Sequence, residues 1–295
     1  MHQLTRKDLV LLGFLILFWG LNWPVMKASV RDFPPLSFRS LSMIGGLAAI
    51  AVIAKLQRAS LRIPAGHRWT VVKLAVPNML IWHACIIIGV KMLSSGRAAI
   101  LGYTMPVWTL LASVLFYSEK LSARAVWAVA SSITATLLLA QHEFSHFAGQ
   151  PLGLLYTFGA AITWGIGNAM MKNSSLSISS VSLTFWSLVC GSVVFCGFAL
   201  SLEIPRWRWP NALECLAIVY GGCITFAVCY VAWFRVARKL SPVASGLSIM
   251  LVPVVGVFGG ALSLGEDIAR EDLWALGFIL VAMALVLSPR KKESA

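Results

Sequence analysis

The sequence contains few charged residues: Asp, Glu, Lys and Arg make up 12% of its 295 residues, whereas a soluble domain carries about 25%. Hydrophobic residues make up 59% of the chain, and the mean hydropathy is +0.82. A water-soluble core needs a polar surface that this composition does not supply. The composition therefore excludes a soluble fold.

Acidic side chains are missing from the middle of the apolar segments. All 11 Asp and Glu residues lie in loops or at segment ends, so a carboxylate proton relay inside the membrane is not supported. The chain also lacks a Gly-x-x-x-x-Gly-Lys loop, which excludes ATP as the direct energy source. The six cysteines form no Cys-x-x-Cys pair, and we expect them to be small core residues. No cofactor is predicted.

Ten apolar segments are long enough, or nearly long enough, to cross a bilayer as helices. They cover residues 9–26, 36–54, 71–90, 98–117, 126–140, 152–171, 181–202, 212–234, 242–264 and 273–287. No loop between them is long enough to hold a soluble domain. The sequence predicts an all-α polytopic membrane protein in which residues 1–295 form a single membrane domain.

The formal net charge of +13 is explained by orientation in the membrane. Ten spans place both termini on one side, and if that side is cytoplasmic, most of the 24 Lys and Arg residues face inward. This distribution obeys the positive-inside rule. We therefore interpret the basic residues as facing an anionic inner leaflet, and no nucleic acid partner is predicted.

Residues 146–295 repeat features of residues 1–145 at a spacing of 145 to 147 residues. The matching residues are Trp19, Gly20, Lys27, Pro106 and Trp127 in the first half and Trp164, Gly165, Lys172, Pro253 and Trp274 in the second. Each half holds five spans, an odd number, so the second half starts on the opposite side of the membrane. Inverted five-helix repeats are typical of alternating-access carriers, whose substrate site lies between the repeats near the midplane.

Three runs of sequence carry a resemblance to a known family. They are FWGLNWP at 18–24, MPVW at 105–108 leading to SEKLS at 118–122, and LVP at 251–253 leading to Gly265 and Glu266. They resemble the EamA-type ten-helix branch of the drug/metabolite transporter superfamily, over the whole chain. The resemblance implies two inverted five-helix repeats, cytoplasmic termini, a bacterial inner-membrane location and export of small metabolites. The aromatic-rich interior is similar to that of bacterial aromatic amino acid exporters.

The second half departs from the repeat at one position of interest. Gly167 stands where Asn22 stands in the first half, and Asn168 is displaced by one residue. We therefore do not expect strict twofold equivalence of the two sides of the site.

Helical spacing selects the residues that we expect to bind a substrate. Trp19 and Asn22 lie three residues apart, and Phe226 and Tyr230 four apart, so each pair shares one helix face. The predicted substrate-binding residues are Trp19, Asn22, Trp82, His83, Tyr103, Pro106, Trp164, Asn168, Phe226, Tyr230 and Met250. Such walls suit a flat amphipathic solute through stacking and cation–π contacts. The alternative is that these rings only pack in the core.

Two titratable or charged side chains have open interpretations. His83 lies deep in its segment, where it either binds a substrate or hydrogen-bonds a neighbouring backbone carbonyl. Arg39 lies near the outer end of its segment, and we expect it to extend to the outer surface. The alternative for Arg39 is a role in contacting a carboxylate that leaves the cavity.

Prolines and glycines inside the spans predict bends and close helix contacts. Pro106 and Pro253 lie mid-span, where each kinks a helix, and we expect both to act as hinges. Gly256 and Gly260 form a Gly-x-x-x-Gly face that permits close helix approach.

One enzyme motif is present. His142-Glu143-x-x-His146 fits the zinc-binding pattern of metalloproteases. We expect it to occupy an outward loop, where no helix presents the two histidines, and we interpret the match as coincidence. No metal site is predicted.

The sequence thus predicts a secondary transporter, not an enzyme, that exports a small amphipathic molecule such as an aromatic amino acid by alternating access. Two alternatives stay open, a multidrug exporter of the same architecture and a membrane zinc metalloprotease. A small-molecule substrate and the lipid bilayer are the predicted partners, and a monomer is compatible with this carrier.

Overall fold

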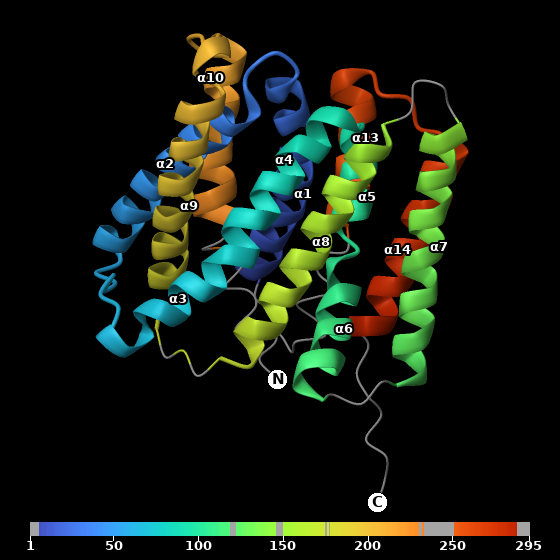
Figure 1. Ribbon diagram of the computed structural model, residues 1–295, viewed down its shortest axis with the longest axis horizontal. Coiled ribbons are helices and arrows are strands. Elements are labelled where there is room, and N and C mark those ends of the chain that lie inside the picture. Colours follow the sequence, from blue (N-terminus) through green and yellow to red (C-terminus); the bar gives the residue numbers. More distant parts are fainter. Residues whose placement is uncertain are drawn as a thin grey trace, which may run out of the picture.

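The computed structural model describes residues 6–118, 122–145, 150–174, 176, 178–229, 232 and 251–287. These residues are almost entirely helical, and no strand occurs among them (Figure 1). The chain is an all-α polytopic membrane protein, as predicted. Six of the described helical segments are each long and apolar enough to cross a membrane: 10–30, 35–56, 65–92, 95–117, 181–202 and 212–229.

The first half contains three continuous spans and two interrupted ones. The continuous helices are α1 (Arg6–Val30), α2 (Pro35–Leu56) and α7 (Ala123–Ser145). The third span consists of α3 (Arg68–Ala75), a π-helical segment η2 (Val76–Ile81) and α4 (Trp82–Met92), after the 3₁₀ turn η1 (Ala65–His67). The fourth consists of α5 (Ser95–Gly102) and α6 (Met105–Tyr117).

The second half follows the same plan in its described residues. Its helices are α8 (Pro151–Lys172), α9 (Ser180–Leu202), α10 (Ala212–Val219), the π-helical segment η4 (Tyr220–Cys229), α13 (Val252–Leu264) and α14 (Arg270–Leu287), with the 3₁₀ turn η3 (Ile204–Arg206) before α10. The π-helical segments η2 and η4 stand at equivalent positions of the two halves. A π-helical segment inside a helix is frequently associated with a functional site.

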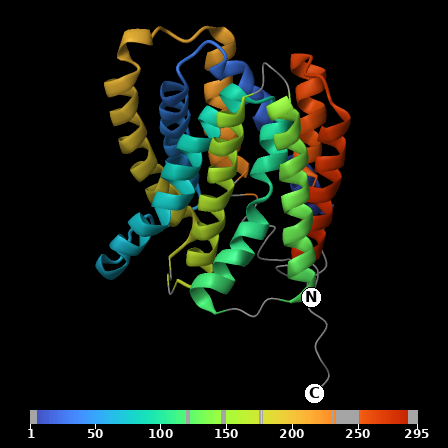
Figure 2. The same cartoon turned by 45° about the vertical axis from the view of Figure 1, so that its right-hand side comes forward.

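The helices of one half pack against helices of the other half, and the pairs are related by the repeat. α2 packs on α9 at one edge of the molecule, and α7 packs on α14 at the opposite edge (Figures 1 and 2). Between these edges, α1 packs on α13 and α6 packs on α8. In the repeat, α8 corresponds to α1 and α13 corresponds to α6. The contact of α8 with α6 is therefore equivalent to the contact of α1 with α13, with the two halves exchanged. This is the packing that a twofold duplication predicts.

Two glycines of the repeat show how closely these exchanged pairs approach. A Cβ atom added to Gly20 of α1 would lie 2.4 Å from Cβ of Val255 in α13. A Cβ atom added to Gly165 of α8 would lie 2.4 Å from Cβ of Trp108 in α6. Val255 and Trp108 are themselves 147 residues apart, so both partners obey the repeat. No side chain larger than hydrogen fits either contact.

The two interrupting prolines each open a helix. α6 starts one residue before Pro106, α13 starts one residue before Pro253, and each helix is 13 residues long. Proline is well tolerated in a first turn because its missing N–H has no intrahelical partner there. α5 ends at Gly102 and α6 begins at Met105, which confirms the predicted break at Pro106. For Pro253, the residues before Leu251 lie outside the described residues, so only the helix start is seen.

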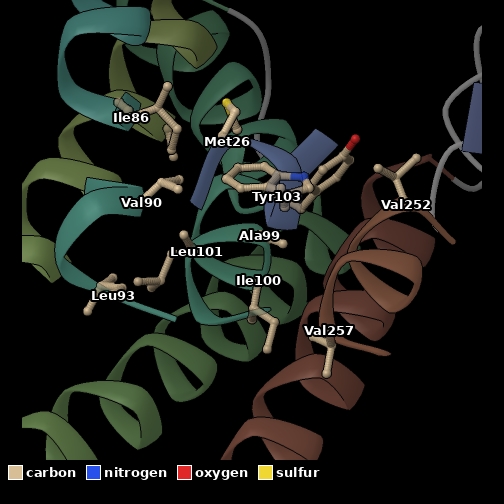
Figure 3. Close-up of a cluster of buried hydrophobic side chains, with 14 of the residues drawn as sticks. Met26, Ile86, Val90, Leu93, Ala99, Ile100, Leu101, Tyr103, Val252 and Val257 are labelled. Carbon is tan, nitrogen blue, oxygen red and sulfur yellow. The ribbon is translucent and has the colours of Figure 1, made fainter. Parts of the chain in front are cut away.

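The apolar core lies where α1, α4, α5 and α13 meet (Figure 3). Its fully buried side chains include Ile86, Val90, Ile100 and Leu101. Large apolar side chains on the outside of the bundle, such as Leu262, are exposed, as expected for a surface that faces lipid. A Cβ atom at Gly256 would lie 2.9 Å from Cβ of Ala99, which confirms the predicted close approach of α13 to its neighbour.

Candidate functional site

A cavity of about 760 Å³ lies between the two halves of the chain. It is lined by residues of α1, α2, the third span, the α5–α6 connection, α6, α8, the α8–α9 connection, α9, η4 and α14. The predicted site residues that line it are Trp19, Asn22, Trp82, His83, Tyr103, Pro106, Trp164, Asn168 and Phe226. The remaining two, Tyr230 and Met250, lie outside the described residues.

Aromatic rings from both halves meet in the cavity wall. The ring centroids of Trp82 and Trp164 are 4.9 Å apart, with an angle of 56° between the ring planes. The rings of His83 and Phe226 meet edge to face at 5.1 Å. Each pair joins the third span of the first half to a helix of the second. Any relative movement of the halves would therefore change these contacts directly.

Asn22 and Thr225 form a polar contact across the halves. The Thr225 hydroxyl donates a hydrogen bond to the Asn22 Oδ1 atom at 3.0 Å. The amide thus comes from α1 of the first half, and its hydroxyl partner comes from the π-helical segment η4 of the second. Both residues line the cavity.

Asn78 lines the cavity but was not among the predicted site residues. It lies on the π-helical segment η2 and lines the cavity. An amide in the middle of an apolar span, directly after Pro77, is itself a signal because polar groups inside the bilayer are costly. The same criterion that selected Asn22 would have found it.

The position of Asn78 explains why the second half carries glycine at 167. A Cβ atom at Gly167 would lie 2.1 Å from Asn78 Oδ1 and 2.4 Å from its Cγ. Asn78 and Thr225 are 147 residues apart, and Asn22 and Gly167 are 145 apart. The Asn22–Thr225 contact and the Gly167–Asn78 contact are therefore equivalent in the repeat. The amide belongs to α1 in the first contact and to the π-helical segment η2 in the second. Gly167 makes the space that Asn78 fills.

Two side chains in the cavity wall have buried polar atoms without a hydrogen-bond partner among the described residues. Within the described part of the chain, neither ring nitrogen of His83 and not the Oδ1 atom of Asn78 has a hydrogen-bond partner. Leaving one such group unsatisfied costs about 1–3 kcal/mol. A backbone carbonyl partner, one of the two interpretations of His83, is therefore not found there.

Arg39 also lines the cavity, although we expected it to extend to the outer surface. Its side chain is buried, with 3% of the residue exposed. Its Nη2 atom lies 3.0 Å from the sulfur of Met26, and its guanidinium carbon lies 5.7 Å from the ring centroid of Phe226. The expectation of surface exposure is wrong because the side chain packs inward against Met26 and Phe226.

The cavity extends to the end of the molecule at which α1 begins. Met171 at the end of α8 lines it, as do Ser174, Leu176 and Ile178 in the connection to α9. α1 starts at this end, and α8 finishes there (Figure 1). The two helices therefore run in opposite directions, as inverted repeats require.

At the opposite end, two carboxylates hold the halves together. Glu203 accepts hydrogen bonds from the backbone N–H groups of Leu36 and Ser37 at 3.0 and 2.7 Å and from the Ser37 hydroxyl. Glu266 accepts from the N–H and hydroxyl groups of Ser95 at 2.8 and 2.7 Å. Both carboxylates belong to the second half and bind helix starts of the first.

An ion pair strengthens the same end. Arg97 Nε of α5 lies 2.8 Å from Asp272 Oδ1 at the start of α14. The sequence places these carboxylates in loops or at segment ends, but their partners cannot be predicted from it because no local pattern connects residues about 170 positions apart.

The zinc-type motif lies in a different setting from the one expected. α7 continues to Ser145, so His142 and Glu143 belong to a helix, and the expectation of an outward loop is wrong for them. His146 lies outside the described residues. Among the residues that the structure describes, no three His, Cys, Asp or Glu side chains could together hold a metal ion. The protease alternative is not supported.

Comparisons with known proteins agree with this architecture. The model of the EamA-like transporter family matches the chain twice, at residues 8–141 and 151–288. The uncharacterized transporter YoaV of Bacillus subtilis is 26% identical over 95% of this chain and 96% of its own. A probable amino-acid metabolite efflux pump of Escherichia coli is 24% identical over 97% and 95%, respectively.

A solved crystal structure shares the fold. It superposes with a TM-score of 0.69 at 17% sequence identity and covers 95% of this chain and 96% of the other. The two family matches fall on the two halves whose helices pack in exchanged pairs around the cavity. The chain therefore belongs to the EamA-like transporter family and is a membrane transporter.

Proposed function

We propose that this protein is a secondary exporter of small amphipathic metabolites, with aromatic amino acids as its main substrates, and that it works by alternating access. The observation that carries the proposal is the cavity of about 760 Å³ between the halves. Its size lies within the range of about 300–1,000 Å³ found for small-molecule sites. Its position matches that of the substrate site in inverted-repeat carriers.

The lining of the cavity supports aromatic substrates. Trp19, Trp82 and Trp164 offer flat apolar faces, and a planar side chain gains about 0.5–1.5 kcal/mol from each good aromatic contact beyond its buried area. The amides of Asn22, Asn78 and Asn168 offer hydrogen bonds to polar groups of the solute. The relatives named as amino-acid metabolite efflux pumps fit this substrate class.

The lining also favours amino acids over the cationic drugs that the multidrug alternative would carry. Among the described lining residues there is no Asp or Glu, so a lipophilic cation has no opposite charge to bind there. Burying an unpaired charge is costly.

The two ends of the cavity support a direction of access. We propose that the end with the chain termini faces the cytoplasm of a bacterial inner membrane, where the positive-inside rule places it. The cavity extends to that end, and Glu203 and Glu266 hold the other end together. The described arrangement then corresponds to a carrier loading from the cytoplasm, and Pro106 and Pro253 are the proposed bend points for the change to the outward state.

The proposal is tested by uptake of radiolabelled phenylalanine and tryptophan into inside-out vesicles that contain the carrier or its variants. We expect Trp164→Ala and His83→Ala to reduce uptake about tenfold or more while the melting temperature in detergent changes little. Trp274→Ala is the matched control, since Trp274 is exposed on the outside of the bundle, and its uptake should stay normal. Loss of folding in the two site variants would assign these residues to the core, and absence of amino acid uptake by the unmodified carrier would refute the proposal.

A further inference from the structure

A row of basic side chains at one end of the carrier has no role in the transport cycle proposed above. It lies on the end of α2, the α2–α3 connection and α3, and we call it the basic strip: Lys55, Arg58, Arg62, Arg68 and Lys73. All five residues are exposed, and none of them forms an ion pair with a described residue. The sequence has no Asp or Glu between Asp32 and Glu119. The charge of the strip is therefore not neutralised by its own stretch of the chain.

The α2–α3 connection is docked on α9 and presents its arginines outward. The Leu61 carbonyl oxygen accepts hydrogen bonds from Trp186 Nε1 at 2.7 Å and from Ser182 Oγ at 3.3 Å, both in α9. Leu61 is partly buried, whereas its sequence neighbour Arg62 and the earlier Arg58 are exposed. The connection therefore has a fixed inner side and a charged outer side.

Helix α3 continues the same two-sided pattern. Val71 and Leu74 are buried, and α3 packs on α9. On the exposed side, Trp69 and Lys73 lie one helical turn apart, with Lys73 Nζ 6.0 Å from the centroid of the Trp69 ring. Trp69 is 67% exposed. In both views α3 projects from the bundle at the end where α1 begins (Figures 1 and 2), so its exposed side is open to the surroundings of the carrier.

An exposed tryptophan among arginines and lysines at the end of a membrane span fits the interface between lipid and water. Tryptophan is enriched at this level because its ring is amphipathic. Groups of about four to eight Lys and Arg residues next to a membrane helix are typical binding sites for anionic lipid headgroups, and Arg binds phosphate oxygens through paired N–H groups. A soluble anion would use the charges but would gain nothing from Trp69. The combination therefore favours a phospholipid over a free phosphate ion.

The matching connection of the second half, between α9 and α10, has a different character. Arg58 corresponds to Glu203 in the repeat, 145 residues further on, and Glu203 is bound to the start of α2. Arg208 of the same connection is paired, because its Nη1 atom lies 2.8 Å from Glu214 Oε2. The charges of the basic strip are not paired in this way.

We propose that the basic strip is a binding site for the phosphate headgroups of anionic phospholipids in the leaflet at this end of the carrier. The site is separate from the cavity and does not depend on which solute the carrier moves. It lies beside the cavity, because α9, to which the α2–α3 connection is bound, contributes Leu183 and Ser187 to the cavity wall. Headgroups bound there would hold the connection and α3 in place at the side of the cavity.

The test measures the binding of short-chain lipids to the full-length carrier, purified in a nonionic detergent and freed of native lipid. Dihexanoyl phosphatidylglycerol, dihexanoyl phosphatidylcholine and inorganic phosphate are titrated separately, and the rise in melting temperature gives an apparent Kd. We expect phosphatidylglycerol to bind at least about tenfold more tightly than the other two. Equal binding of the two lipids would overturn the inference. Equal binding of inorganic phosphate and phosphatidylglycerol would also overturn it, because the strip would then be a site for a soluble anion.

A variant assigns the binding to the strip. It removes three of the five charges: Arg58→Gln, Arg62→Gln and Arg68→Gln. Each basic residue near an anionic surface gives about a fivefold gain in affinity, so phosphatidylglycerol binding should weaken by about a hundredfold. The matched control removes three exposed arginines at the opposite end of the carrier, Arg31→Gln, Arg206→Gln and Arg270→Gln, and it should bind phosphatidylglycerol normally. Full binding by the strip variant, or an equal loss in the control, would overturn the inference.

Salt dependence tests the same point on the unmodified carrier, whether or not the variants fold. Exposed charges act over about 10 Å at 0.1 M salt but over only about 3 Å at 1 M. Raising the NaCl concentration from about 0.1 to 1 M should therefore weaken phosphatidylglycerol binding about tenfold and leave phosphatidylcholine binding unchanged. Phosphatidylglycerol binding that does not respond to salt would contradict the role of the charges. None of these measurements involves a transported solute, so a failure of the proposed function would leave this inference standing.

Discussion

The two halves of this transporter agree in backbone and differ in the polar side chains that face the cavity. Their interrupted spans carry π-helical segments at equivalent positions, and their proline-started helices α6 and α13 have equal lengths. Both helices end at a left-handed residue, Ser118 or Gly265. The side chains, in contrast, give Arg39 and Asn22 to the first half where the second has Thr184 and Gly167.

This difference separates two requirements on the same chain. Movement between inward and outward states needs two halves with similar backbones that can exchange their packing. Recognition of an asymmetric solute needs different groups at its two ends. In the proposed alternating-access mechanism, the similar backbones of the halves serve the first requirement, and the different side chains in the cavity serve the second. Substitutions that make the halves more alike should therefore damage the molecule.

The largest effect is expected when the second half receives the amide of the first. Gly167→Asn places atoms where Asn78 lies, 2.1 Å from the added Cβ, and overpacking of this kind costs about 1–3 kcal/mol. We expect a clear drop in melting temperature in detergent. The double variant Gly167→Asn with Asn78→Thr recreates the Asn22–Thr225 arrangement and should recover most of the loss.

Gly159→Ala on the same helix is the control for Gly167→Asn. Nothing lies within 4 Å of a Cβ at Gly159, and alanine is favoured over glycine in a helix by about 1 kcal/mol. Its stability should be unchanged or higher. Equal stability of Gly167→Asn and Gly159→Ala would show that Asn78 does not occupy the space described here.

The next effect concerns the end that the second half closes with Glu203. In Glu203→Gln the hydrogen bonds to Leu36 and Ser37 lose their charge, which weakens closure by about 1–2 kcal/mol. We expect a cysteine placed in the cavity to react faster with a membrane-impermeant thiol reagent from that side. Asp32→Asn, at an exposed carboxylate in the α1–α2 connection, should not change the rate, and equal acceleration by both variants would contradict the closure.

A smaller effect distinguishes the two amides. Asn22→Ala removes the hydrogen bond from Thr225 and should cost about 1 kcal/mol of stability. Asn78→Ala removes an amide whose Oδ1 atom has no hydrogen-bond partner among the described residues, so its stability should change less while its transport rate falls. Thermal unfolding together with counterflow checks this, and the reverse order of stabilities would contradict it.

The smallest effect on stability is expected at the prolines. Pro106→Ala should cost no more than about 1 kcal/mol, because a proline in the first turn stabilises mainly by restricting the unfolded chain. If the break before α6 is a hinge, the same variant should slow transport several-fold at nearly unchanged melting temperature. Pro24→Ala, inside the continuous α1, is the comparison variant, and equal transport rates would remove the hinge role from Pro106.

Much of the fold followed from the sequence because it depends on short-range patterns. Apolar length predicted the spans that the described residues show, and the repeat spacing matched Trp19 with Trp164, which both line the cavity. The third and eighth spans were predicted as continuous helices, and their π-helical segments were not expected. Such segments depend on the packing of both halves around the cavity, which no local pattern reports.

The predicted residues that line the cavity include its aromatic rings and the amides of Asn22 and Asn168, but not Asn78 or Arg39. Trp82, His83 and Phe226 were among the predicted residues, and all three line the cavity. Arg39 was placed at the surface because its sequence position is near a helix end, and only the folded structure shows the ring of Phe226 next to it. The contact of Asn78 with Gly167 likewise joins segments that are distant in the sequence. The sequence therefore showed that Gly167 departs from the repeat, but it did not show that Asn78 occupies the space beside it.

Access to the cavity from both faces of the membrane is the most direct test of the account. In a carrier without native cysteines, Ser187→Cys places one thiol in the cavity wall, and a membrane-impermeant thiol reagent is applied to either face. The account predicts labelling from both faces, faster from the face that carries the chain termini, and slower labelling from each face when phenylalanine is present. Labelling from one face alone under all conditions would contradict alternating access through this cavity.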